Sequence, residues 1–148
     1  MKLIKKDAFI ILDKPLKITL TDILLPFGIE NKYNNYISKL SLNNENYLMF
    51  KKIEDDIIEN LIDMDNKYQL KSEIYKYKNY KSLKSKILLI KNNIITEIID
   101  NKSNIIGIDE IKVKNRVNLI LLLDKLWIND NDIVFYNWKI LYIKKLND

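Results

Sequence analysis

Tyrosines and lysines alternate in residues 73–86, which read EIYKYKNYKSLKSK. An aromatic ring can stack on a nucleic-acid base and a lysine ammonium group can neutralise a phosphate, so sites for single-stranded nucleic acid combine the two. The segment is therefore a candidate nucleic-acid-binding surface. The candidate site consists of six residues: Lys76, Lys78, Tyr80, Lys81, Lys84 and Lys86. Since lysine is a point-charge binder of phosphate, the expected binding is salt-sensitive and largely independent of base sequence.

A purely structural interpretation of the same segment stays open. Side chains of a regular strand alternate between its two faces. Tyr75 and Tyr77 would then point to the face opposite Tyr80 and away from the nearest lysines. On this interpretation the two tyrosines complete the hydrophobic core, and the lysines are only solvated.

The positive net charge is weak evidence for either interpretation, because codon bias accounts for part of the lysine content. The chain has a formal net charge of +5, with 24 lysines against the single arginine Arg116, and one alanine, Ala8. Lysine, asparagine, isoleucine and tyrosine all have AT-rich codons, which indicates an AT-biased genome such as that of a virus, plasmid or organelle. Charge is also segregated, because residues 54–65 hold six acids and no base, whereas residues 67–91 hold eight lysines and one acid. The basic segment could form one face for a polyanion, or it could simply complement the acidic one.

Several chemistries are excluded by residue types that the chain lacks. Cysteine and histidine are absent, which excludes disulfides, thiolate or imidazole zinc sites and Ser-His-Asp triads. Glycine occurs only at Gly28 and Gly107, too few for phosphate-loop or dinucleotide fingerprints. We therefore predict no cofactor, no metal site and no catalytic residue. No apolar run reaches the ~20 residues that span a bilayer, so we expect an intracellular protein without membrane contact.

One triplet resembles a known catalytic motif. Glu110-Ile111-Lys112 lies in an apolar stretch, IIGIDEIKVK, and resembles the E-x-K triplet of restriction-type PD-(D/E)xK nucleases. The resemblance implies magnesium held by Glu110 and an upstream aspartate, with Lys112 polarising the attacking water. Asp100 is the upstream candidate. At ~3.3 Å per residue along a strand it would lie roughly 15 Å or more from Glu110, too far to share an ion.

The pattern of apolar residues predicts the elements. Phe50, Ile53, Ile57, Leu61 and Met64 recur with helical spacing, which predicts a helix over about 46–64 with Asn43 or Asn44 as its cap. Its other face would hold Glu54 and four further acids. A second helix, apolar nearly all round, is predicted over 115–128. The strand-like segments are 8–12 and 16–24 around a turn at 13–15, then 67–78, 86–99, 104–114 and 132–146.

These elements predict a single α+β domain over residues 1–148. We expect a mainly antiparallel sheet of about five to seven strands with two packed helices, 46–64 and 115–128. The favoured function is a small non-catalytic accessory subunit of a larger intracellular or viral assembly, with protein partners, that contacts nucleic acid through residues 67–91. The alternatives are a purely structural subunit of a virion or ribosome, and a metal-dependent nuclease of the PD-(D/E)xK type.

Overall fold

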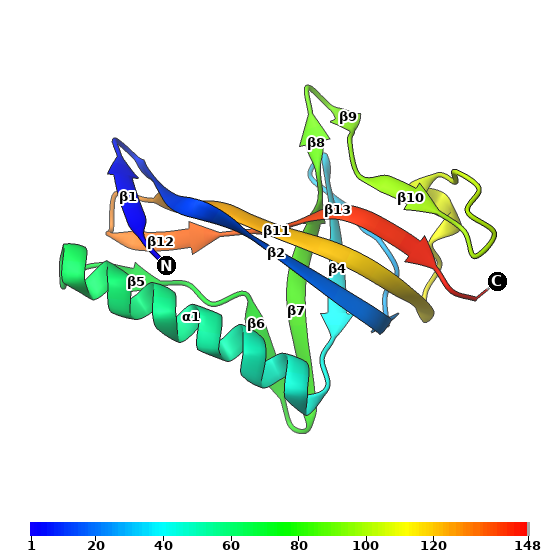
Figure 1. Cartoon of the computed structure of the whole chain (residues 1–148), viewed down its shortest axis with the longest axis horizontal. Coiled ribbons are helices and arrows are strands. Elements are labelled where there is room, and N and C mark those ends of the chain that lie inside the picture. The colour runs from blue at the N-terminus through cyan, green and yellow to red at the C-terminus, as the bar shows by residue number, and fades with distance from the viewer. Residues whose placement is uncertain (148) are drawn as a thin grey trace.

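The chain folds into a strongly curved mixed sheet with a long helix along one side (Figure 1). A computed structural model describes residues 1–147. Within them, eleven strands belong to one sheet, two more form a separate hairpin, and one α-helix is present. The expected sheet of five to seven strands with two packed helices is therefore wrong.

The elements, in chain order, have the following bounds. The strands are β1 (Leu3–Lys6), β2 (Phe9–Leu25), β3 (Glu30–Lys32), β4 (Asn35–Ser41), β5 (Gln69–Leu70), β6 (Ile74–Tyr77), β7 (Tyr80–Ile87), β8 (Leu89–Ile90), β9 (Asn93–Ile94), β10 (Glu97–Ile99), β11 (Asn115–Ile128), β12 (Ile133–Tyr136) and β13 (Trp138–Lys145). The helices are α1 (Asn44–Met64) and the short 3-10 helix η1 (Ile108–Glu110).

Five long strands form a partly open barrel. They pair in the order β2-β11-β13-β7-β4, with β13 and β7 parallel and the other pairs antiparallel. The two ends of this series, β2 and β4, come into contact and close the curve. Figure 1 shows β2 and β11 running together across the molecule while β4 and β7 cross them steeply. A five-stranded, partly open Greek-key barrel is the architecture of the OB-fold.

The second predicted helix, 115–128, is in fact the central strand β11. Val117, Leu119, Leu121 and Leu123 are buried at alternate positions, and β11 pairs with β2 on one side and β13 on the other. A strand that is paired on both sides and partly covered on both faces carries apolar residues on both faces, as residues 119–123 do. The same run suits a buried helix, so periodicity alone does not separate the two.

The helix predicted over 46–64 is confirmed as α1, Asn44–Met64. Asn43 caps it by accepting a hydrogen bond from the backbone N–H of Asn46 at 2.7 Å. The buried face of α1 carries Phe50, Ile57 and Leu61 as expected, but it also carries Glu54, which we had placed on the outer face. Glu54 follows Phe50 by four residues and precedes Ile57 by three, so helix geometry puts all three together.

The predicted turn at residues 13–15 is also wrong, because β2 continues through it from Phe9 to Leu25. The ladder between β2 and β11 is irregular here: Leu16 pairs with Leu123 and Ile11 with Lys125, so four residues of β2 face one of β11. Pro15 lies in this bulged stretch, where the missing N–H of proline costs no ladder hydrogen bond. The expected strand over 104–114 is likewise replaced by a bridge at Ile105 and the helix η1.

No helix within residues 1–147 is long and apolar enough to cross a membrane.

Candidate nucleic-acid interface

A tight hairpin places three tyrosines of the opening segment on one face of the sheet. The chain reverses at Lys78, which adopts a φ of 55°, and β6 then pairs antiparallel with β7. Tyr77 lies opposite Tyr80, and Tyr75 lies two pairs further along opposite Ser82, so all four side chains share a face. The three rings are 44%, 70% and 38% exposed in chain order. The expectation that Tyr75 and Tyr77 complete the core is therefore wrong.

The same face carries a groove of about 560 Å³. Its lining is aromatic and basic: Phe27, Lys32, Ile37, Lys39, Tyr75, Lys76, Tyr77, Tyr80, Ser82 and Lys84. Every charged residue of this described lining is a lysine, so the groove presents positive charge beside exposed ring faces.

Strand pairing positions the lysines. Lys39 of β4 is the direct cross-strand neighbour of Lys84 of β7. The ammonium group of Lys39 also lies 5.4 Å from the ring centre of Phe27, which follows β2 and is half exposed. Like charges placed opposite each other destabilise a sheet. The pairing of Lys39 and Lys84 therefore suits a site that receives an anion.

The structure divides the six residues predicted from sequence. Tyr80 and Lys84 line the groove, and Lys76 borders it from the hairpin, where its cross-strand partner is Lys81. Lys86 follows two positions along the same face of β7, opposite Ile37. Lys78 sits at the hairpin turn with its ammonium group 5.4 Å from the ring centre of Tyr77.

Lys81, the sixth, points to the other face. Its Nζ lies 2.8 Å from the side-chain oxygen of Asn44 and 4.3 Å from the ring centre of Tyr47, both on the first turn of α1. It therefore belongs to the contact between β7 and the helix.

Burial changes the proton affinity of two of these groups. It raises the pKa of Tyr80, opposed by the hydrogen bond with Ser82, so this ring is a neutral phenol. Burial also lowers the pKa of Lys86, and the positive charge of Lys84 acts in the same direction.

Sequence reasoning missed Phe27, Lys32, Lys39, Tyr75 and Tyr77 as lining residues. The two tyrosines could have been found, because Lys78-Asn79 between YKY and YKS is a turn signal that reverses their face relative to Tyr80. Lys39 and Phe27 join the groove only through long-range pairing, for which no local signal exists.

Gly28 fixes the turn that presents Phe27. Its φ is +62°, and a Cβ atom at this position would lie 3.0 Å from the backbone carbonyl carbon of Lys112. The carbonyl oxygen of Gly28 also accepts a hydrogen bond from the buried hydroxyl of Ser38 at 2.9 Å. Gly28→Ala is expected to lower the free energy of unfolding by about 1–3 kcal/mol. Thermal denaturation checks this, and a melting temperature equal to that of the parent protein would show that the turn adapts without strain.

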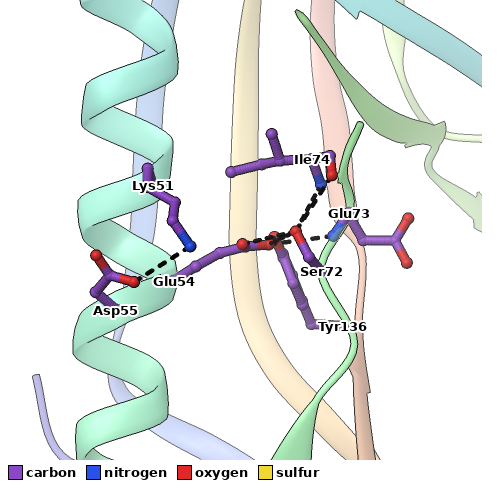
Figure 2. Close-up of polar contacts among 7 residues, drawn as sticks. All are labelled: Lys51, Glu54, Asp55, Ser72, Glu73, Ile74 and Tyr136. Atoms are coloured by element: carbon purple, nitrogen blue, oxygen red, sulfur yellow. Dashed lines mark hydrogen bonds and ion pairs between the residues drawn. The ribbon is translucent and has the colours of Figure 1, made fainter. Parts of the chain in front are cut away.

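A cluster of hydrogen bonds around the buried Glu54 anchors the start of the tyrosine hairpin (Figure 2). The carboxylate of Glu54, on α1 and 2% exposed, accepts hydrogen bonds from the hydroxyl of Ser72 at 2.7 and 2.9 Å and from the backbone N–H of Glu73 at 3.1 Å. The hydroxyl of Tyr136 donates a third, short hydrogen bond. Since residues 72–73 lead directly into β6, this cluster fixes where Tyr75 and Tyr77 begin.

The nuclease-like triplet does not form a metal site. Glu110 lies in η1 rather than in a strand, and Asp100 accepts hydrogen bonds from the backbone N–H groups of Lys102 and Asn104 in its own turn. Within residues 1–147 no group of three or more potential metal ligands gathers.

Comparison with known proteins gives likeness in fold alone. The sequence matches no protein-family model and no curated protein. Among solved structures, the C-terminally truncated single-stranded DNA-binding protein of bacteriophage Enc34 aligns with a TM-score of 0.57 and 15% identity, covering 99% of this chain and 94% of that one. The protein gp2.5, a single-stranded DNA-binding protein encoded by bacteriophage T7, aligns with a TM-score of 0.58 and 9% identity, covering 90% of this chain and 87% of that one.

The Enc34 protein in complex with single-stranded DNA aligns with a TM-score of 0.53 and 13% identity, covering 97% of this chain and 88% of that one. At these identities the likeness establishes a shared fold over nearly the whole of each chain.

Proposed function

We propose that this protein binds single-stranded DNA in the groove between β4, β6 and β7. The observation that carries the proposal is the gathering of three exposed tyrosines and four lysines in one groove from separate segments of the chain. Rings of this kind stack on bases without regard to their identity, and lysines neutralise the phosphates between them.

The position of the groove in the fold supports the same function. Oligonucleotides bind OB-folds on the face of the second and third barrel strands, with help from neighbouring loops. In this chain β4 and β7 are the second and third of the five long strands, and both line the groove. The structural neighbours are named as phage single-stranded DNA-binding proteins, which agrees with a viral role for this one.

A salt titration with an oligothymidylate tests the proposal. The logarithm of the binding constant is plotted against the logarithm of the salt concentration. If each of the four lining lysines neutralises one phosphate, the slope is about −3. Binding that is absent at low salt would refute the proposal. Duplex DNA of matched length is expected to bind more weakly, because its bases cannot stack on the tyrosines.

Removing one tyrosine ring measures the contribution of stacking to DNA affinity separately from the contribution of the lysine charges. Tyr77→Ala is expected to weaken binding of the oligonucleotide by about 1–3 kcal/mol with an unchanged salt slope, because a stacking surface is lost and no charge is altered. Tyr77→Phe keeps the ring and serves as the matched control, with an affinity close to that of the parent protein. Equal affinities of the alanine and phenylalanine variants would contradict a stacking role.

An accessory role with protein partners remains a prediction. The described surface that suits it is a second groove of about 380 Å³ beside β10, lined largely by isoleucines: Ile94, Ile98, Ile105, Ile106 and Ile108. Exposed apolar patches of this kind are typical of protein contact sites.

A further inference from the structure

An acidic residue, Glu73, lies beside the basic groove as a neighbour of the lining residue Lys84. The backbone N–H of Lys84 donates to the carbonyl oxygen of Glu73 at 3.0 Å, which extends the ladder of β6 and β7 by one pair. Directly opposed residues of an antiparallel pair project to the same face. The side chain of Glu73 therefore shares its face with Lys84, Tyr75 and, one strand further, Lys39.

One carboxylate oxygen of Glu73 is buried without a hydrogen-bond partner. The residue is 4% exposed, and its Oε2 has no hydrogen bond to any described residue. Figure 2 shows this carboxylate pointing away from the cluster around Glu54, whose hydrogen bonds involve only the backbone of Glu73. A buried polar atom left unpaired is costly, and the cost is greatest when the group is charged.

Charged groups of α1, of β7 and of the segment before β6 surround this carboxylate. Burial has the largest effect and raises the pKa of Glu73 above its ordinary value, and the negative charge of Glu54 on α1 acts the same way. The positive charges of Lys84 and Lys86 on β7, and of Lys71 just before Glu73, favour the ionised form.

Two other lysines and a phenol lie nearby. Lys39 of β4 is the cross-strand neighbour of Lys84. Lys139 of β13 is the neighbour of Lys86, but its ammonium group forms an ion pair with Asp124 at 3.0 Å. Tyr136 of β12 directs its hydroxyl to Glu54, and burial raises its pKa, so it stays neutral.

We propose that Glu73 is a counter-charge beside the groove, which opposes the binding of DNA phosphates at Lys84 and Lys86 and takes up a proton when they bind. The inference rests on the proposed function. A phosphate at these lysines competes with Glu73 for the same positive charge and adds a negative charge beside a carboxylate that is already poorly solvated. Both effects favour the neutral acid in the complex.

The sign of the pH dependence follows. Because DNA binding raises the proton affinity of Glu73, the complex holds more protons than its separate components, and affinity falls as pH rises through the pKa of Glu73. In the free protein the raised pKa contributes stability that is present below the unfolded-state pKa and is lost as pH rises through the folded-state pKa. Glu73→Gln should remove both dependences and should fold at least as stably near neutral pH.

The test compares Glu73→Gln with Glu59→Gln, which makes the same charge change on the exposed face of α1. Fluorescence anisotropy with an oligothymidylate at fixed salt, from about pH 5 to about pH 8, should show ~3- to 10-fold tighter binding for Glu73→Gln and a flatter pH profile. Glu59→Gln should follow the parent protein. Calorimetry of the parent protein in buffers of different ionisation enthalpy should show net proton uptake on binding.

The outcomes separate the two proposals. The role of Glu73 is overturned if Glu73→Gln binds DNA with the affinity and pH profile of the parent protein and calorimetry shows no proton uptake. In that case the proposal that DNA binds in the groove is unaffected. Absence of DNA binding by the parent protein and by both variants overturns the proposed function itself. Tighter binding by Glu59→Gln equal to that of Glu73→Gln would assign the effect to net charge, which also overturns the role of Glu73.

Discussion

Replacing Lys39 and Lys84 together by glutamate is expected to weaken binding of single-stranded DNA by at least about 100-fold at moderate salt. The two side chains are cross-strand neighbours at the centre of the groove, so two phosphate-neutralising charges become two repulsive ones at one place. The salt slope should also fall by about 1.4, because two fewer phosphates are neutralised. Fluorescence anisotropy across a salt series measures both quantities.

The matched control is Lys52→Glu with Lys102→Glu. Both lysines are exposed, one on α1 and one in the turn after β10, and neither lines the groove. This variant has the same net charge as the groove variant, so it is expected to lose only a small part of the affinity through long-range electrostatics. Equal losses in the two variants would show that binding follows net charge and not the groove.

Glu54→Gln is expected to lower the free energy of unfolding by about 2–4 kcal/mol. An amide in place of the carboxylate removes the negative charge and replaces one acceptor oxygen by a donor, whereas three groups now donate to this carboxylate: the hydroxyls of Ser72 and Tyr136 and the backbone N–H of Glu73. The hydrogen bonds to a charged acceptor are then lost, and one hydroxyl has to reverse its direction to accept from the amide. Tyr136→Phe removes one donor alone and should cost less, about 1–2 kcal/mol. Urea denaturation measures both changes.

The control for Glu54→Gln is Glu59→Gln on the exposed face of the same helix, which should leave the urea midpoint nearly unchanged. Because residues 72–73 lead into β6, Glu54→Gln should also weaken DNA binding by loosening the tyrosine hairpin. An unchanged midpoint for Glu54→Gln would contradict the view that this carboxylate holds the segment before β6 against the helix.

The sequence predicted the elements whose signals are local. Helix α1 was found because five apolar residues repeat at helical spacing behind a capping asparagine, both of which are visible within about twenty residues of sequence. Strand β11 was not found, because an unbroken apolar run fits a buried helix as well as a strand paired on both sides. Only the partners β2 and β13, far away in the chain, decide between the two.

The candidate site was predictable to a similar extent. The tyrosine and lysine segment pointed to Tyr80, Lys84 and Lys76, which line or border the groove, and treating it as one strand put Tyr75 and Tyr77 on the wrong face. A lysine-rich chain offers no way to single out Lys39 before β4 is known to pair with β7. The burial of Glu54 could have been deduced from helix geometry, but its acidic neighbours suggested an exposed face.

Ultraviolet cross-linking of the protein to an oligothymidylate, followed by mass spectrometry of the cross-linked peptides, tests the central claim most directly. Stacked rings cross-link efficiently to bases because they lie in contact with them. We expect cross-links at Tyr75, Tyr77 and Tyr80 of the hairpin and at Phe27 beside it, and their loss at high salt. Cross-links confined to aromatic residues outside the groove, such as Phe9 and Trp127 at the far end of β2 and β11, would contradict the assignment of the site.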